Sequence, residues 1–348
     1  MELEVQENPN YICKYERKEK EKEDLFIYYS SKEMEIKLSE KIADIFNLEL
    51  SLFKYIGRGG GSFIYEAEIK GRKKSLIIKV ISEEKYKNSN EIEIMVKLRH
   101  PNIISLFGYY TAKNTEQFII MENGKMDLKY WQYNLLKRAF LSETFLCYIA
   151  FQILEGLKYL NRCSIIHYDI KPNNIVMDEA LNIKIIDFST SVDMSLIKES
   201  HVKLKYRGTA LYMAPEVINR EKIEIKNFHK IDLFSLGVML YRLAFGYYPY
   251  DLQREDADND DIIYQKITSE WKAENNETEF SSHFINFLNC LLEKDIDKRI
   301  SINEALDHYW IQGAKIIMEE KENIYNANAF LTSLMTDYLH KFNEYIFF

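Results

Sequence analysis

Two short segments, HYDIKPNN and DFS, carry the side chains best suited to chemistry. Asp169 could accept a proton from a hydroxyl group and orient that hydroxyl as a nucleophile. Lys171 could balance the negative charge of a phosphoryl group in transit. Asn174 and Asp187 offer the amide and carboxylate oxygens that Mg²⁺ prefers, alongside phosphate oxygens. Together these residue types indicate metal-assisted transfer of a phosphoryl group.

A glycine-rich stretch, GRGGGS, precedes these segments and begins at Gly57. Glycines allow the backbone to approach a phosphate group closely and to adopt positive φ angles. A dinucleotide-binding loop runs from a strand into a helix, whereas this stretch is followed by a second strand pattern, FIYEAEI. A glycine loop between two strands indicates a lid over ATP.

Lys79 lies inside the apolar strand pattern SLIIKVI. An amine in such a place requires a partner, because an unpaired buried charge is costly. Glu91, on a helix predicted over residues 90–98, can supply it, and Glu93 is the reserve candidate. A lysine held in this way would be directed at phosphate oxygens. The alternative is a purely structural ion pair.

The elements that must position these residues change character along the chain. FKYIG, FIYEAEI, SLIIKVI and FIIME are rich in β-branched and aromatic residues and predict strands from Phe53 to Glu122. The chain then becomes mainly helical, starting with a periodic apolar segment after Ser142, which is expected to cap that helix. The sequence therefore predicts an α+β fold in which a small β-rich part precedes a larger helical part.

These motifs resemble those of the eukaryotic protein-kinase superfamily, serine/threonine type, from Phe53 to Trp310. The glycine loop resembles the ATP lid, and Lys79 matches the lysine of V-A-I-K. HYDIKPNN resembles the catalytic loop H-R-D-x-K-x-x-N, and DFS resembles D-F-G. GTALYMAPE resembles the end of an activation segment, and Arg299 resembles the arginine that pairs with Glu216.

The resemblance implies a two-lobed fold with a small β-rich N-lobe and a larger α-helical C-lobe. It also implies ATP and Mg²⁺ as cofactors and serine or threonine hydroxyls of proteins as acceptors, because Lys171 and Thr209 match the serine/threonine pattern. The implied catalytic residues are Asp169, Lys171, Lys79 and Glu91. The implied nucleotide contacts are Gly57, Gly59, Ile64, Ile77, Lys79, Met121, Glu122, Gly124 and Val176. The implied metal ligands are Asn174 and Asp187.

Several positions depart from the family pattern. Ile77 replaces the usual alanine, and its extra bulk is expected to tighten the adenine site and weaken ATP binding. Tyr168 replaces the arginine that reads a phosphate on the activation segment in this family, so activation through that contact is not expected. Ser189 replaces the glycine of D-F-G, and Ser62 replaces the third glycine of the lid.

Length, net charge, cysteine spacing and apolar stretches limit the classes of protein to which the chain can belong. The chain has 348 residues and a formal net charge of −8, and this acidity argues against sequence-independent nucleic-acid binding. Widely spaced cysteines and an acidic, non-apolar N-terminus favour the cytoplasm, with the nucleus as an alternative. The longest apolar stretch, after Leu233, is interrupted by Arg242 and is expected to be a buried helix, so no membrane span is predicted.

We expect four parts along the chain. They are a charged extension at 1–52, a kinase N-lobe at 53–122, a kinase C-lobe at 123–312 and a helical tail at 313–348. Within the extension, FIYYS predicts a strand and residues 38–46 predict a short helix. The apolar face of the tail would pack on the domain itself or, alternatively, bind a partner.

Alternatives to an active protein kinase are a pseudokinase scaffold with the same fold and a small-molecule kinase. The retained Lys79, Asp169 and Asp187 favour an active enzyme, and the A-P-E segment favours a protein substrate. The acidic run 255–261 would attract basic peptides or, alternatively, is a solvated loop.

Overall fold

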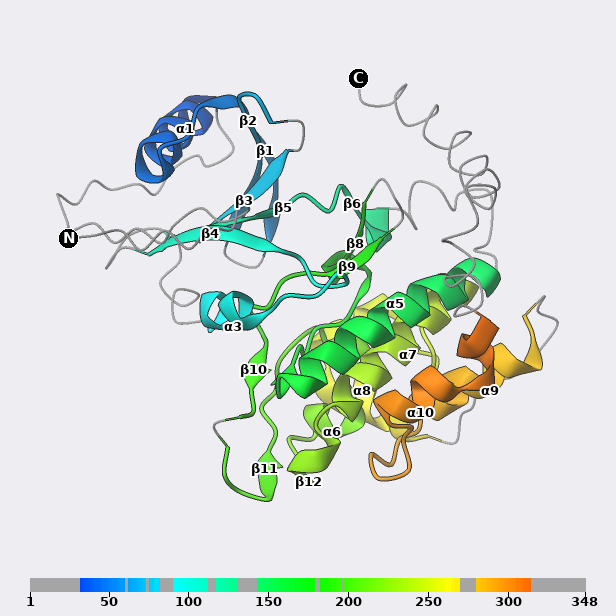
Figure 1. Cartoon of the computed structure of the whole chain (residues 1–348). Coiled ribbons are helices and arrows are strands. Elements are labelled where there is room, and N and C mark those ends of the chain that lie inside the picture. Colours follow the sequence, from blue (N-terminus) through cyan, green and yellow to red (C-terminus); the bar gives the residue numbers. More distant parts are fainter. Residues whose placement is uncertain are drawn as a thin grey trace. The chain divides into compact units, whose positions relative to one another are not determined.

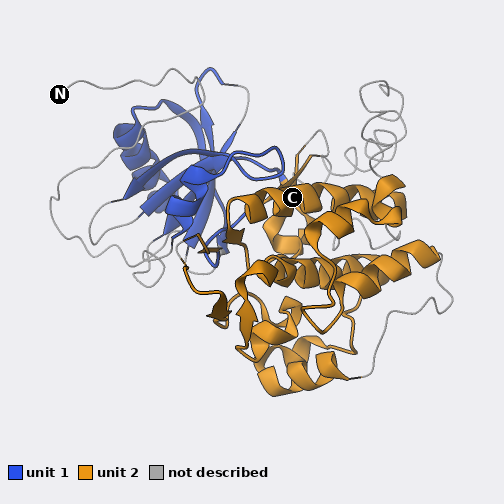
Figure 2. Ribbon diagram, turned by 60° about the horizontal axis from the view of Figure 1, so that its bottom comes forward, with its two compact units in different colours: residues 1–125, 186–191 blue, residues 126–185, 192–348 orange. Residues whose placement is uncertain are grey.

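The structure is a computed structural model of the whole chain, and it forms two compact units (Figure 2). Unit 1 comprises residues 1–125 and 186–191, and unit 2 comprises residues 126–185 and 192–348. The described residues are 32–59, 62–72, 75–81, 90–111, 117–130, 143–178, 182–195, 197–269 and 280–313. The strand predicted at FIYYS, the cap at Ser142 and the tail from residue 314 lie outside them.

Unit 1 contains a five-stranded antiparallel sheet in the order β1-β2-β3-β5-β4 (Figure 1). The strands are β1 (Leu50–Gly59), β2 (Ser62–Ile69), β3 (Leu76–Ile81), β4 (Leu106–Thr111) and β5 (Gln117–Glu122). Helices α1 (Lys32–Phe46) and α3 (Glu91–Lys97) belong to the same unit. The predicted strands are confirmed. Strand β4 was not predicted, because its sequence LFGYYT has a glycine and lacks valine and isoleucine.

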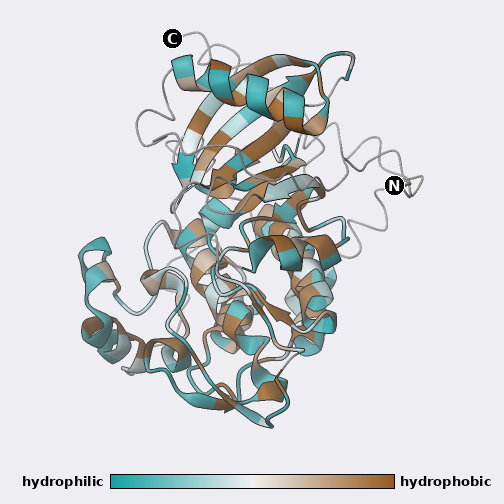
Figure 3. Ribbon diagram, turned by 90° about the vertical axis from the view of Figure 1, so that its left-hand side faces the viewer, coloured by the Kyte–Doolittle hydropathy of each residue, from teal (hydrophilic) through white to brown (hydrophobic). Residues whose placement is uncertain are grey.

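Helix α1 covers one face of this sheet, and Figure 3 shows it lying across largely apolar strands. Its buried apolar residues share one core with those of the strands beneath them; these are Met34, Leu38, Ile42 and Phe46. The helix starts before the predicted residue 38, because Met34 continues the same apolar face. A further anchor is the buried Glu35 carboxylate, which accepts a hydrogen bond from the Tyr55 backbone N–H at 2.7 Å.

Alternation along the strands separates the two faces of the sheet. Ile78 and Val80 lie in the core under α1. Ile77 and Lys79, which alternate with them in sequence, therefore point to the opposite face. The packing of α1 thus leaves the face that carries Lys79 uncovered by that helix.

Unit 2 is mainly helical, as predicted. Its longer helices are α5 (Glu143–Arg162), α7 (Lys230–Phe245), α8 (Asp260–Thr268) and α9 (Ser282–Leu291), with shorter α6 (Pro215–Ile218) and α10 (Ile302–Asp307). Its strands are β6 (Met126–Asp127), β7 (Ile165–Ile166), β8 (Ile175–Met177), β9 (Ile183–Ile185), β10 (Val192–Asp193), β11 (His201–Lys203) and β12 (Lys222–Glu224).

Helix α7 contains the apolar stretch identified in the sequence and is buried along nearly all of its length. Gly246 caps its C-terminal end, and the φ of 83° at this residue is the left-handed conformation that glycine adopts without strain. None of the helices in the described ranges is long and apolar enough to cross a membrane.

Candidate active site

Two carboxylates hold Lys79 within unit 1. Its Nζ lies 2.7 and 2.9 Å from the two carboxylate oxygens of Glu91 and 2.9 Å from Oδ1 of Asp187. Lys79 is 7% exposed and Glu91 is 1% exposed. Burial alone would lower the pKa of Lys79, but the charges of Glu91 and Asp187 outweigh it, so the pKa is raised. The amine therefore carries its charge at every physiological pH.

Local structure explains how these partners meet. Glu91 lies in the first turn of α3, and it makes this pair in place of the reserve candidate Glu93, which is exposed. Asp187 follows β9 and has a left-handed backbone with φ of 64°, a conformation that aspartate tolerates better than branched residues. Its side chain is 36% exposed, so solvent reaches the carboxylate even though Lys79 is bound to it.

Other predicted nucleotide contacts share the face of Lys79. Ile64 is the cross-strand partner of Lys79, and Ile77 is the partner of Met121. Cross-strand partners project to the same side of a sheet, so all four lie on the face opposite α1. The remaining predicted contacts of unit 1 are Gly57 and Gly59 in β1, Glu122 at the end of β5 and Gly124 just beyond it.

A second polar cluster lies in unit 2 around Asp169. Lys171 Nζ donates to Asp169 Oδ2 and to Thr209 Oγ1, both at 2.6 Å. The Thr209 hydroxyl donates to Asp169 Oδ1 at 2.7 Å. Asn174 Nδ2 donates to the backbone oxygen and to Oδ2 of Asp169, both at 2.8 Å. The carboxylate of Asp169 is therefore oriented from three sides.

Buried backbone contacts fix the loop that carries Asp169. Asp232, at the start of α7, accepts the N–H groups of His167 and Tyr168, each at 2.8 Å. Burial raises the pKa of Asp232, and these two bonds oppose that shift by stabilising the ionised form. At Gly208, φ is 96° and a Cβ would lie 2.1 Å from the Tyr168 carbonyl oxygen. Only glycine fits there.

Tyr168 cannot replace the charge of the arginine found in the family pattern. It is buried, and burial followed by the Asp232 charge raises the pKa of its phenol, which therefore stays neutral. The segment around residues 201–206 is held by contacts that do not involve Tyr168. Strand β11 pairs with β12, and the Tyr206 hydroxyl donates to Asp260 at 2.5 Å. Asp260 belongs to the acidic run, and its carboxylate is engaged in this contact.

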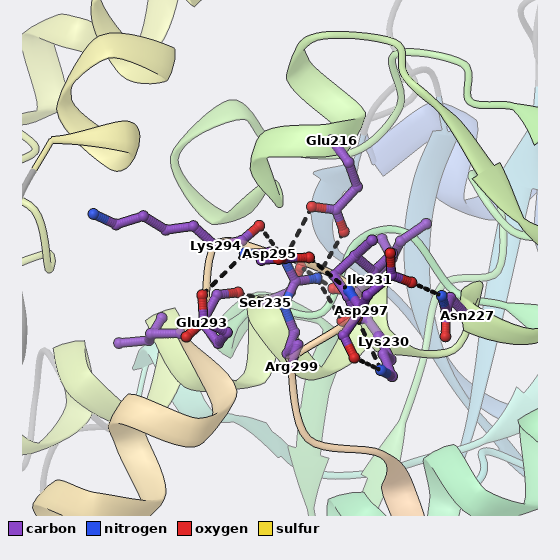
Figure 4. Close-up of polar contacts among 12 residues, drawn as sticks. Glu216, Asn227, Lys230, Ile231, Ser235, Glu293, Lys294, Asp295, Asp297 and Arg299 are labelled. Carbon is purple, nitrogen blue, oxygen red and sulfur yellow. Dashed lines mark hydrogen bonds and ion pairs between the residues drawn. The ribbon is translucent and has the colours of Figure 1, made fainter.

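The buried ion pair predicted between Glu216 and Arg299 is present (Figure 4). Arg299 donates to both Glu216 oxygens, at 2.7 and 2.9 Å. It also donates to the backbone oxygens of Glu293 and Lys230, at 2.8 and 3.0 Å. These bonds tie the A-P-E segment to α7 and to the loop before α10.

The predicted site residues thus form two groups, one in each unit. Lys79, Glu91 and Asp187 come together in unit 1, and Asp169, Lys171 and Asn174 come together in unit 2. Val176, on β8, belongs to unit 2 and is buried. From the sequence, Thr209 indicated only that the acceptor is serine or threonine. Its contacts with Asp169 and Lys171 were missed, although its place at the start of the TALYMAPE segment was a usable signal.

Comparison with known proteins decides the family. The profile of the protein kinase domain matches residues 50–311. The chain belongs to the protein kinase family. The resemblance seen in the sequence and the fold that it implied are therefore confirmed.

Several curated relatives are protein kinases by name, and two of the three described here are named as serine/threonine kinases. "Serine/threonine-protein kinase fused" from Drosophila melanogaster is 29% identical, over 79% of this chain and 33% of the relative. "Calcium-dependent protein kinase 6" from Plasmodium berghei is 31% identical, over 82% of this chain and 19% of the relative. "CBL-interacting serine/threonine-protein kinase 12" from Arabidopsis thaliana is 28% identical, over 74% and 52%. The chain thus spans from about a fifth to about half of these relatives.

Proposed function

We propose that this chain is a serine/threonine protein kinase domain that transfers the γ-phosphate of ATP to protein hydroxyl groups. The observation that carries the proposal is the buried Lys79 amine, bound to Glu91 and Asp187. Burying these charges costs several kcal/mol for each ion, roughly offset by their pairing. A phosphoryl-transfer site requires an ammonium group that is fixed and directed at phosphate oxygens, and this requirement accounts for the ion pairs of Lys79. The two relatives that are named as serine/threonine kinases support the same acceptor class.

The unit 2 cluster would act on the acceptor. Asp169 would receive the proton of the hydroxyl group as its oxygen bonds to the γ-phosphorus. The bond from that phosphorus to the β–γ bridging oxygen breaks, and ADP leaves with the electron pair. Lys171, which contacts both Asp169 and Thr209, would balance the charge that develops on the phosphoryl group.

Under the same proposal, each unit would supply one ligand to Mg²⁺. Asn174 uses its amide nitrogen for Asp169, which leaves its amide oxygen as a ligand. Asp187 offers a partly exposed carboxylate. Oxygen ligands of this kind, completed by phosphates and water, are those that Mg²⁺ prefers. Bound Mg²⁺ would screen the charge of the phosphate groups.

The nucleotide contacts follow from the same proposal. The backbone of the glycine lid would cover the phosphates, and apolar side chains would enclose the adenine ring. The residues assigned to these roles are Gly57 and Gly59 in the lid, Ile64, Ile77, Met121 and Val176 around the ring, and Glu122 and Gly124 at the backbone edge of the base.

Phosphoamino acid analysis tests the proposal. The purified chain is incubated with γ-labelled ATP, Mg²⁺ and a generic basic protein, beside the Asp169→Asn variant. We expect labelled phosphoserine or phosphothreonine from the unmodified chain and no label from the variant, because asparagine cannot take up the proton. Phosphotyrosine alone would contradict the acceptor class. Loss of transfer in both, with ATP still raising the melting temperature, would instead support the pseudokinase scaffold.

A further inference from the structure

A closed polar network joins three segments of the unit 1 sheet near the stretch expected to meet the nucleotide base. Asn123 Nδ2 donates to Glu66 Oε1 and to Ser75 Oγ, both at 2.8 Å. The Ser75 hydroxyl donates to the same Glu66 oxygen, also at 2.8 Å. Glu66, Ser75 and Asn123 therefore contact one another in every pair, and we refer to them as the hinge triad.

The hinge triad is on the nucleotide face of the sheet. Glu66 is the cross-strand partner of Ile77, and Ser75 precedes Ile77 by the two-residue spacing that returns a side chain to the same face. Ile77 is also the partner of Met121, two residues before Asn123. The network therefore lies next to the proposed adenine contacts and on the side away from α1.

Asn123 also organises the chain that follows it. Its Oδ1 accepts the backbone N–H of Lys125 at 2.8 Å, and Lys125 has a left-handed φ of 63°. Such a conformation is costly for a residue with a Cβ unless surrounding contacts stabilise it. Both ends of one amide are thus committed, the nitrogen to Glu66 and Ser75 and the oxygen to residue 125.

Burying the polar groups of the hinge triad costs hydration free energy, and a purely structural role would not require that cost. Ser75 is buried, and an apolar side chain there would pack without losing hydration. A polar network in which each member has a partner specifies a single orientation of the groups that it joins. The group oriented here is the backbone of residues 122–124.

We propose that the hinge triad positions the backbone of residues 122–124 for recognition of the nucleotide base. The inference rests on the proposed function and makes Glu66, Ser75 and Asn123 positioning residues for ATP. Without the triad, residues 122–125 would populate other conformations. Apparent affinity falls in proportion to the competent fraction, and one lost hydrogen bond corresponds to about a fivefold loss.

The sharpest test reverses the polarity of the network. Asn123→Asp keeps the oxygen that accepts from Lys125 but replaces the donor to Glu66 with a carboxylate, so two carboxylates face each other. We expect adenosine to bind at least about tenfold more weakly. Glu66→Gln retains an oxygen acceptor for Asn123 and Ser75 but loses the charge that strengthens their hydrogen bonds, so we expect adenosine to bind about fivefold more weakly. In the double variant, the amide introduced at position 66 can donate to the carboxylate introduced at position 123. Affinity should then return to within about twofold of the unmodified chain.

Comparing a ligand that contains the base with one that lacks it distinguishes a positioning role of the hinge triad from general destabilisation of the fold. Dissociation constants are measured calorimetrically for adenosine and for inorganic triphosphate, which lacks the base. Asn123→Asp should weaken adenosine and leave triphosphate unchanged, and in turnover it should raise KM for ATP with little change in kcat. Ser51→Ala is the matched control, since Ser51 lies exposed in the same sheet and its hydroxyl contacts only the Glu68 backbone oxygen among its described partners.

Three results would overturn the inference. They are unchanged adenosine binding in Asn123→Asp, an equal loss for triphosphate, and no recovery in the double variant while its melting temperature is normal. Failure of the unmodified chain to bind ATP would instead count against the proposed function. The two failures are therefore distinguishable.

Discussion

Removal of one charge from the Glu216–Arg299 pair should strongly destabilise unit 2. The Arg299 side chain has no exposed surface, and that of Glu216 is 2% exposed. Glu216→Gln leaves a buried guanidinium without its counter-charge and directs an amide N–H₂ toward one of its nitrogens. Breaking a buried pair on one side costs about 3–5 kcal/mol. At about 2–4 °C for each kcal/mol in a domain of this size, the melting temperature should fall by about 6–20 °C.

The assay is thermal unfolding followed by far-ultraviolet circular dichroism, with Glu224→Gln as the matched control. Glu224 forms an ion pair with Lys226 on the surface of the same unit, and exposed pairs contribute little. We expect the melting temperature of the control to equal that of the unmodified chain. If Glu216→Gln unfolds at the same temperature as the control, the reasoning about the buried pair is refuted.

The remaining predictions concern the site and its pH dependence. Lys79→Met should reduce phosphate transfer about 100-fold or more with binding of protein substrate intact; a variant with full turnover would remove Lys79 from the site. Ile77→Ala should tighten ATP binding in calorimetry, because the isoleucine that replaces the usual alanine is expected to crowd the proposed adenine site; unchanged or weaker affinity would contradict that expectation. Burial, followed by the charge of Lys230, lowers the pKa of His229 to about 4, so His229 is neutral in the folded chain while the unfolded chain takes up a proton below about 6.5. The free energy of unfolding should therefore be independent of His229 protonation above pH 6.5 and should decline as pH falls toward 4, by up to about 1.4 kcal/mol per pH unit. Urea unfolding of His229→Gln should show a flatter dependence of this free energy on pH, and an equal slope would contradict the assignment.

Much of the site could be predicted from the sequence because its residues lie in short contiguous motifs. Asp169, Lys171 and Asn174 occupy one loop, so their contacts in unit 2 follow from local chain geometry. Lys79 and Glu91 are separated by one connection and could be paired by the rule that a buried charge needs a partner.

Contacts between distant segments could not be predicted in this way. Glu66, Ser75 and Asn123 come from three separate segments of the sheet, and no spacing in the sequence shows that they meet. The Tyr206 contact with Asp260 likewise depends on how α8 packs. Helix α1 was assigned to an extension, but its apolar face completes the core of the sheet, since burial against a sheet is a tertiary property that helical periodicity alone does not reveal.

The most direct test of the account is phosphate transfer by the chain compared with the Asp187→Asn variant, each with ATP, Mg²⁺ and a basic protein substrate. The substitution removes a carboxylate that would hold Mg²⁺ and that contacts Lys79, so its melting temperature is measured alongside. We predict labelled phosphoserine or phosphothreonine from the unmodified chain and no transfer by a folded variant. Equal transfer by both chains, or none by the unmodified chain under conditions where it binds ATP, would contradict the claim that this is an active kinase site.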